Sequence, residues 1–171
     1  MNSIDTSSMI RVNQAGEFGA ARIYAGQLAI MGDRHPMSRA IRHMASQEAR
    51  HLETFNAMMA KRGVRPTALH PFWNVAGYGL GALTALMGPT AAMACTAAVE
   101  TEIDRHYAEQ LQQLGAFDPE LSDAIIDFQA EEIEHKEEAI ASGGQTLPGY
   151  AIFAGAIRLG CKAAIALSKR I

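Results

Sequence analysis

Residues 48–51 read Glu-Ala-Arg-His, and residues 132–135 read Glu-Ile-Glu-His. Two side chains three positions apart lie on one face of an α-helix, with their Cβ atoms about 5–6 Å apart. A carboxylate and an imidazole at this spacing can therefore bind one metal ion. A single Glu-x-x-His pair arises easily by chance, but two of them predict that each of two helices carries one pair of metal ligands.

A second repeat accompanies the first. Residues 17–28 (EFGAARIYAGQL) align without a gap with residues 100–111 (ETEIDRHYAEQL), and Glu, Arg, Tyr, Ala, Gln and Leu coincide. The offset is 83 residues here and 84 residues for the Glu-x-x-His pairs. We interpret the chain as a tandem duplication of a helical hairpin within one domain, 1–171, with half-repeats of about 8–88 and 89–171.

Each half thus supplies one Glu and one Glu-x-x-His pair, which is the ligand set of a ferritin-like dimetal four-helix bundle. Four carboxylates inside a bundle would repel one another and be costly to desolvate unless two divalent cations compensated their charge. Oxygen and imidazole donors suit iron or manganese better than zinc. The predicted metal ligands are Glu17, Glu48, His51, Glu100, Glu132 and His135.

Some neighbouring residues could support this site. Tyr24 and Tyr107 follow their Glu by seven residues, two turns along the same face, and could hydrogen-bond to a ligand; ordinary packing is the alternative. His106 is a weaker candidate for the same role. Arg22 and Arg105 could pair with surplus carboxylates. We expect the remaining Glu residues near the ligands to be surface charge, namely Glu102, Glu131, Glu134, Glu137 and Glu138.

Composition narrows the function classes. A net charge of −3 in 171 residues argues against a surface for nucleic acid. Cys95 and Cys161 lie in apolar stretches without CxxC spacing, so we expect neither a disulfide framework nor a structural zinc site. Residues 1–8 are polar and too short for a signal or transit peptide, which predicts an intracellular or already processed protein.

Gly and Pro residues divide the chain into helices. Four bundle helices are expected over about 8–31, 36–62, 89–114 and from Pro119 to the glycines at 143–144. Two further helices, 72–87 and 150–167, are apolar and occupy equivalent places in the two halves. The predicted fold is therefore all-α: a ferritin-like four-helix bundle built from a tandem hairpin repeat, plus two apolar or amphipathic helices.

The two extra helices need a surface to cover them, and we expect that surface to be a membrane interface. The run from Pro71 to Val99 has no charged residue and is long enough to span a bilayer, but Gly88-Pro89 interrupts it. The last helix carries Arg158, Lys162 and Lys169 on one stripe, which would suit anionic headgroups. The alternative is that the apolar helices bury each other in a homo-oligomer.

Four segments closely resemble one known family. They are RVNQAGEFGA at 11–20, RIYAGQ at 22–27, PFWNV at 71–75 and ACTAAVE at 94–100. They are similar to demethoxyubiquinone hydroxylase, the di-iron monooxygenase family of ubiquinone biosynthesis, and the resemblance covers nearly the whole chain. It implies that the six residues named above bind two iron ions.

The resemblance also implies a reaction and a location. A di-ferrous centre would use O2 to hydroxylate the benzoquinol ring of a polyprenylated demethoxyubiquinol, with electrons ultimately from NADH. The sequence has no Rossmann glycine pattern, so NADH would act through a partner, a surface site or the quinone. The expected location is peripheral, on the cytoplasmic face of a bacterial inner membrane or on the matrix face in mitochondria. An accessory ubiquinone-biosynthesis protein could be a partner.

Two other classes share this ligand set. A ferritin-like iron-storage protein would lack the two apolar helices and form a soluble shell, which gel filtration would reveal. A peroxide-detoxifying protein could be rubrerythrin-like, but such proteins normally carry a CxxC module that is absent from this sequence. A manganese catalase would be recognised by metal analysis.

Overall fold

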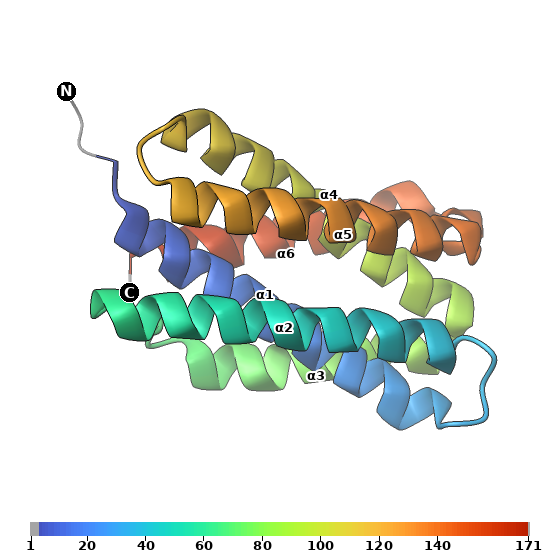
Figure 1. The fold of residues 1–171 in the computed structure, drawn as a ribbon. Coiled ribbons are helices and arrows are strands. Elements are labelled where there is room, and N and C mark those ends of the chain that lie inside the picture. The colour runs from blue at the N-terminus through green and yellow to red at the C-terminus, as the bar shows by residue number, and fades with distance from the viewer. Residues whose placement is uncertain (1–3, 171) are drawn as a thin grey trace.

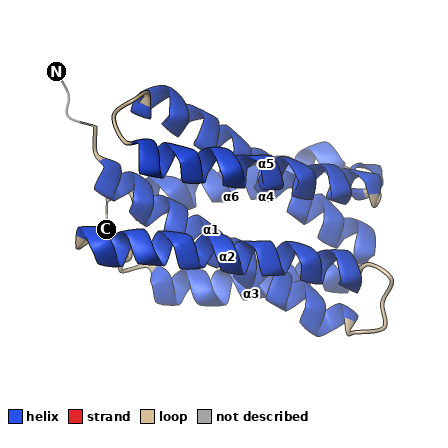
Figure 2. Ribbon diagram, viewed as in Figure 1, coloured by secondary structure: helices blue, strands red, loops and turns tan. Residues whose placement is uncertain are grey.

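The computed structural model describes residues 4–170, which form helices joined by loops (Figures 1 and 2). The described residues contain no strand, which confirms the all-α prediction. Residues 1–3, part of the segment for which we expect no signal peptide, lie outside the described range. The elements are α1 (Thr6–Met31), α2 (Ser38–Arg62), α3 (His70–Leu86), α4 (Pro89–Leu114), α5 (Pro119–Ala141), a 3-10 turn (Gly144–Thr146) and α6 (Tyr150–Ser168).

The expected helix boundaries are correct to within about two residues because the stop signals are local. Asp118 accepts a hydrogen bond from the backbone N–H of Leu121 at 3.1 Å, and Pro119 occupies the first position of α5. Gly88, with φ of 115°, separates α3 from α4. That backbone conformation suits glycine and breaks the long uncharged run into two helices.

The two halves of the chain have the same internal arrangement. In each half, two helices form an antiparallel hairpin, α1 with α2 and α4 with α5, and the third helix packs on the first, α3 on α1 and α6 on α4. In Figure 1, α2 and α5 face the viewer, whereas α3 and α6 lie behind. The bundle α1, α2, α4, α5 is therefore covered on one side only, and its interior lies between the two hairpins.

Close packing of α3 on α1 depends on glycine. A Cβ atom at Gly81 would lie 1.9 Å from the carbonyl oxygen of Ile23, and one at Gly77 would lie 2.9 Å from that of Gly19. The two backbones thus approach more closely than any side chain would allow. This contact sets the distance between the apolar helix and the bundle.

We expect Gly81→Ala to destabilise the protein by about 1–3 kcal/mol, because α3 must move away from α1 to admit the methyl group. Gly79→Ala is the matched control, since nothing lies within 4 Å of a Cβ at Gly79 on the same helix. That change should be neutral or stabilising, because alanine favours helix by up to about 1 kcal/mol. Thermal unfolding measures both variants; equal melting temperatures would contradict the close contact.

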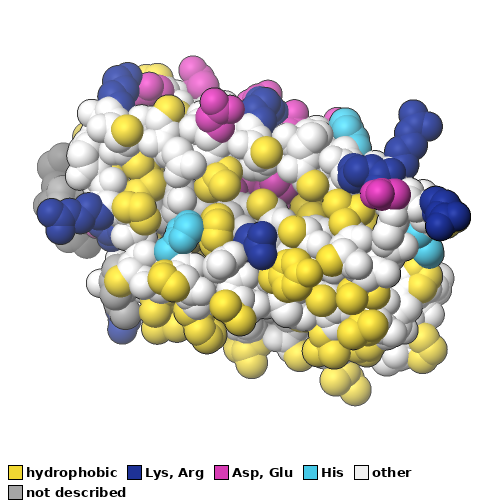
Figure 3. Space-filling model, turned by 90° about the horizontal axis from the view of Figure 1, so that it is seen from below, with side chains coloured by type: hydrophobic (Ala, Val, Ile, Leu, Met, Phe, Trp, Pro, Cys, Tyr) yellow, Lys and Arg dark blue, Asp and Glu magenta, His cyan; other side chains and the backbone are white. Residues whose placement is uncertain are grey.

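The outer surfaces of α3 and α6 are apolar and exposed. Phe72 and Val75 on α3 are 60% and 72% exposed, and Ile152 and Leu159 on α6 are 82% and 69% exposed. Figure 3, a view from below, shows hydrophobic side chains over much of the face, with charged side chains mainly along its upper border and at its ends. Helix α6 is long and apolar enough to cross a membrane by length and composition, and only 11% of it is buried.

The expectation that Glu102 is surface charge is wrong. Glu102 is 1% exposed, and its carboxylate lies 2.6 Å from Arg158 Nε and 3.9 Å from Lys162 Nζ. The interface between α4 and α6 therefore contains an ion-paired carboxylate. Two of the three cations in the predicted basic stripe contact this group, so the stripe is not wholly available for an external anion.

Candidate metal centre

Six buried side chains from four helices meet in the bundle interior. Glu17 lies on α1, the first Glu-x-x-His pair on α2, Glu100 on α4 and the second pair on α5, and each residue is at most 2% exposed. The side chains form two groups that could each hold a metal ion, with ligand atoms within 4.8 Å of one another. One group is Glu17, Glu48, His51 and Glu132; the other is Glu48, Glu100, Glu132 and His135. The structure thus brings together all six residues proposed from the sequence, with Glu48 and Glu132 common to both groups.

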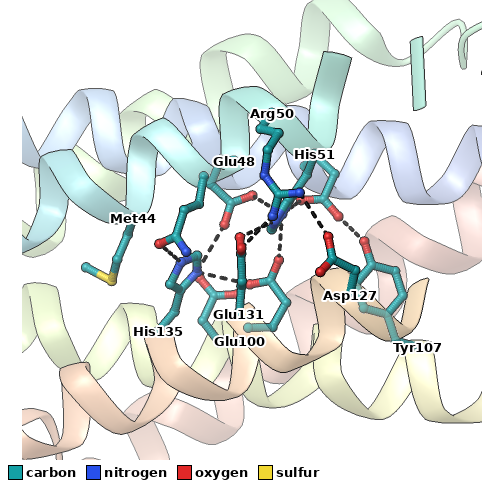
Figure 4. Close-up of polar contacts among 12 residues, drawn as sticks. Met44, Glu48, Arg50, His51, Glu100, Tyr107, Asp127, Glu131 and His135 are labelled. Carbon is teal, nitrogen blue, oxygen red and sulfur yellow. Dashed lines mark hydrogen bonds and ion pairs between the residues drawn. The ribbon is translucent and has the colours of Figure 1, made fainter. Parts of the chain in front are cut away.

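Both imidazoles turn the same ring atom toward the carboxylates. His51 Nδ1 lies 3.2 Å from Glu17 Oε2 and 3.1 Å from Glu132 Oε1. His135 Nδ1 lies 3.2 Å from Glu132 Oε2 and 3.3 Å from Glu48 Oε1. Figure 4 shows this inward arrangement, with Met44 on one side of the carboxylates and Tyr107 on the other. Carboxylate oxygens and imidazole nitrogens therefore converge on one small volume.

The protein does not satisfy these carboxylates by itself. Both oxygens of Glu48, and Oε2 of Glu100, are buried and accept no well-aligned hydrogen bond among the described residues, although His135 Nδ1 lies 3.3 Å from Glu48 Oε1. Burial, followed by repulsion from the neighbouring Glu132, raises the pKa of Glu48 and of Glu100 well above the usual range. Orphaned buried oxygens are costly, and the donor set fits divalent cations that would compensate their charge.

The carboxylates around His51 stabilise the charged form of its imidazole. Burial alone would lower the pKa of His51, but hydrogen bonding and charge interactions with Glu132 and Glu17 raise it to about 10. Burial likewise opposes ionisation of Glu132, yet His135 and His51 lower its pKa to about 2. A metal ion bound at His51 Nδ1 would have to displace a proton, so metal binding should release protons.

The two tyrosines occupy equivalent places around the cluster. Tyr24 donates a hydrogen bond to Glu100 Oε1 at 2.6 Å, and Tyr107 donates to Glu17 Oε1. Burial, followed by the charge of the bonded glutamate, raises the pKa of each phenol well above its usual value. Both hydroxyls therefore stay protonated and orient the glutamate that only one metal group uses.

His106 contacts Gln110 rather than one of the four clustered glutamates. Its Nε2 contacts the side-chain nitrogen of Gln110 at 2.7 Å, and burial together with Lys169 and Arg105 lowers its pKa to about 4. Of the two arginines expected near surplus carboxylates, Arg105 contacts Glu102 at 3.5 Å. Arg22 instead lies over the ring of Tyr78, 5.1 Å from its centroid.

Two residues beside the cluster were missed. Glu131, expected to be surface charge, is 22% exposed on its side chain and lies 2.9 Å from His51 Nε2. Gln47 Oε1 lies 3.0 Å from His135 Nε2. Each residue directly precedes the Glu of a Glu-x-x-His pair, and this shared position is the signal that could have identified both. Glu134, Glu137 and Glu138 are exposed, as predicted.

An apolar groove of about 460 Å³ runs between α3 and α6 over the back of the bundle. Gly16 and Val99 line it and directly adjoin Glu17 and Glu100 in the sequence, so the groove reaches the helix segments that carry two of the buried glutamates. Glu102 is the one charged side chain among the lining residues described. The groove could hold a large apolar molecule with one end near the cluster.

Comparison with known proteins identifies relatives over nearly the whole chain. The family model of the ubiquinone biosynthesis protein COQ7 matches residues 5–168. The 3-demethoxyubiquinol 3-hydroxylase of Rhodospirillum rubrum is 48% identical over 162 residues, 95% of this chain and 76% of the relative. The mitochondrial NADPH-dependent 3-demethoxyubiquinone 3-hydroxylase of Mus musculus is 46% identical over 99% of this chain and 80% of the relative. The mitochondrial 5-demethoxyubiquinone hydroxylase of Saccharomyces cerevisiae is 39% identical over 95% and 77%.

Proposed function

The chain belongs to the COQ7 family of ubiquinone biosynthesis proteins, and from that premise we propose that it hydroxylates the benzoquinol ring of a polyprenylated demethoxyubiquinol with O2 at a centre of two iron ions. Hydroxylation of a demethoxyubiquinone is the activity for which its relatives are named. The iron, the oxygen source and the quinol form of the substrate are the finer parts of the proposal.

One observation carries the proposal: two Glu/His groups share Glu48 and Glu132. Shared carboxylates would allow two cations to bind next to each other, and each cation would have one glutamate and one imidazole of its own. Glu17 and His51 would serve one cation, and Glu100 and His135 the other. Two iron ions there would supply the O2-activating and electron-transfer chemistry that no side chain of the chain provides.

The protein would hold the metal ligands in position and exclude water from the cluster. Tyr24 and Tyr107 hold the two unshared glutamates through hydrogen bonds, so these carboxylates cannot rotate freely. The cluster is almost completely buried, which would limit the loss of oxidant to water. The groove supports the proposal of an apolar substrate. Its small lining residues would leave room for a ring beside α1 and α4, and a polyprenyl tail would extend between α3 and α6.

The electron source is proposed to be a reduced nicotinamide nucleotide, because several relatives are named NADPH-dependent. The sequence contains no Rossmann fingerprint. Electrons would therefore arrive through a partner, a surface site or the quinone itself.

The direct test is turnover of a short-chain demethoxyubiquinol under air. Iron-loaded protein supplied with a reductant should form a product one oxygen atom heavier, detected by mass spectrometry. Metal-free protein should form none. Oxidation of the quinol without added oxygen, or accumulation of a large ferric core instead of product, would refute the hydroxylase and favour peroxide-detoxifying or iron-storage chemistry.

We also propose that α3 and α6 dock the protein on a membrane surface. Their exposed apolar side chains flank the groove that would receive the substrate, and a polyprenyl tail resides in lipid. A protein lying on one leaflet could take the ring while the tail remained in the bilayer. In a cell this would be the cytoplasmic face of a bacterial inner membrane or the matrix face in mitochondria.

Liposome flotation tests the docking. Wild-type protein should float with anionic vesicles, and Ile152→Asp combined with Leu159→Asp should remain at the bottom, because two charges would enter the apolar face. Ile126→Asp with Phe117→Asp is the matched control, since these residues are 56% and 64% exposed but lie outside α3 and α6. If wild-type protein does not float, the apolar helices serve oligomerisation instead.

A further inference from the structure

The Nε2 atoms of His51 and His135 face different kinds of hydrogen-bond partner. His51 Nε2 faces the carboxylate of Glu131 at 2.9 Å, whereas His135 Nε2 faces the amide oxygen of Gln47 at 3.0 Å. Gln47 and Glu131 occupy the same place in the two halves, one residue before the Glu of each pair. Each imidazole is therefore held by the residue that the opposite half contributes.

Glu131 is fixed by a second layer of contacts. Arg50 Nη2 lies 2.5 Å from Glu131 Oε1, and Arg50 Nη1 lies 2.9 Å from Asp127 Oδ2 (Figure 4). The guanidinium also lies 5.1 Å from the ring of Phe128, which in turn stacks on His51 with ring centroids 4.1 Å apart. The carboxylate thus has one oxygen on the arginine and the other on the imidazole.

Among the described residues, Gln47 has no equivalent of this support. The position of Arg50 is taken in the other half by Glu134, which is exposed and carries the opposite charge. His51 therefore faces a carboxylate that is ion-paired with an arginine, whereas His135 faces a neutral amide. The two acceptors differ in charge, although their distances from Nε2 are almost the same, 2.9 Å and 3.0 Å.

The charge of the acceptor matters once the imidazole binds a cation through Nδ1. The Nε2–H group then donates its hydrogen bond outward, and a carboxylate accepts it about twice as strongly as an amide does. A carboxylate acceptor also makes the imidazole a more basic ligand, and loss of such an outer partner typically costs roughly 10–100-fold in metal affinity.

We propose that the two metal positions are inequivalent. Glu131, held by Arg50, is a positioning residue that makes the Glu17/His51 position the tighter one for an imidazole that has lost its Nδ1 proton, and Gln47 leaves the Glu100/His135 position the weaker one. This inference rests on the proposed dimetal centre. It adds that, once His51 has lost this proton, the cations enter in a defined order, with the Glu17/His51 position filled first.

Stepwise addition of Co²⁺ to metal-free protein, followed by calorimetry in the absence of O2, tests the proposal without any assay of activity. Wild-type protein should bind two ions in steps whose affinities differ roughly 10–100-fold after correction for the protons released, which titrations in two buffers of different ionisation enthalpy count. Glu131→Gln preserves the shape of the side chain but removes its charge, and should weaken the first step until the two steps merge. Gln47→Glu should strengthen the second step. Glu134→Gln, an exposed change on the same helix, should alter neither.

Iron-57 Mössbauer spectra of the di-ferrous protein supply a second readout that a merely structural effect would not move. Two distinct quadrupole doublets are expected in the wild type, and their splittings should converge in Glu131→Gln. Two equal binding steps in the wild type, or an unchanged ratio of affinities in Glu131→Gln, would overturn the inference while leaving the dimetal centre intact. Failure to bind any Co²⁺ would contradict the centre itself, and the inference with it.

Discussion

Glu132→Ala protein is expected to lose both metal ions and all hydroxylase activity. Glu132 belongs to both ligand groups, and its two oxygens lie 3.1 Å from His51 Nδ1 and 3.2 Å from His135 Nδ1. Its removal would therefore take a ligand from each of the two proposed cations. Metal analysis after anaerobic loading with Fe²⁺ should fall from about two ions per chain to nearly none.

Glu134→Ala is the matched control, because Glu134 is an exposed glutamate on the same helix. It should keep both ions and full activity. His135→Ala should lose iron mainly at one position, since His135 belongs to one group only. Full iron content in Glu132→Ala, or one ion per chain in the wild type, would contradict the dinuclear centre.

Gly160→Phe should block hydroxylation while leaving the iron in place. Gly160 lines the groove between α3 and α6, and nothing lies within 4 Å of a Cβ built there, so the aromatic side chain can enter the groove without displacing the backbone. A substrate that must occupy the same space loses binding free energy, and each loss of about 1.4 kcal/mol lowers kcat/KM about tenfold. Steady-state turnover of a short-chain demethoxyubiquinol measures the effect.

The control lies on the same helix. Gly155 is also open, with nothing within 4 Å of a Cβ, but it is not among the residues that line the groove. Gly155→Phe should therefore retain activity in detergent-free assays with a short-chain substrate. If both variants turn over the substrate as fast as wild type, with normal iron content, the groove is not the substrate site.

The helices could be predicted because their signals are local. Asp118-Pro119, Gly63 and Gly88-Pro89 mark ends that do not depend on the rest of the fold. The six buried glutamates and histidines were found for a related reason. Internal repetition shows which glutamates share a helix position, and the Glu-x-x-His spacing places two side chains on one face before any tertiary contact is known.

The contacts around those residues depend on tertiary packing, which spacing alone does not give. Glu102 lies two positions after Glu100 and hence on nearly the opposite face of α4, so solvent exposure was the natural expectation. Helix α6 covers that face instead and brings Arg158 onto the carboxylate. Glu102 and Arg105 make this face of α4 polar in the sequence, so the pattern gives no sign that another helix covers it.

The pairs around the imidazoles illustrate the same limit. Glu131 and Gln47 contact the histidines of the opposite half, across the interface between α2 and α5. To predict such contacts, one must know how α2 and α5 are aligned along each other, although they lie about 84 residues apart in the chain. The repeat could have indicated that the two residues have equivalent roles, but it could not have shown that they exchange partners or that Arg50 clamps only one of them.

The origin of the oxygen atom added to the quinol tests the central claim most directly. Iron-loaded protein, given a short-chain demethoxyubiquinol and a reductant under ¹⁸O2 in unlabelled water, should yield a hydroxylated product that carries one ¹⁸O atom by mass spectrometry. The reciprocal experiment, unlabelled O2 in H2¹⁸O, should give unlabelled product. Incorporation of oxygen from water, or consumption of O2 without labelled product, would contradict a monooxygenase at the Glu/His centre.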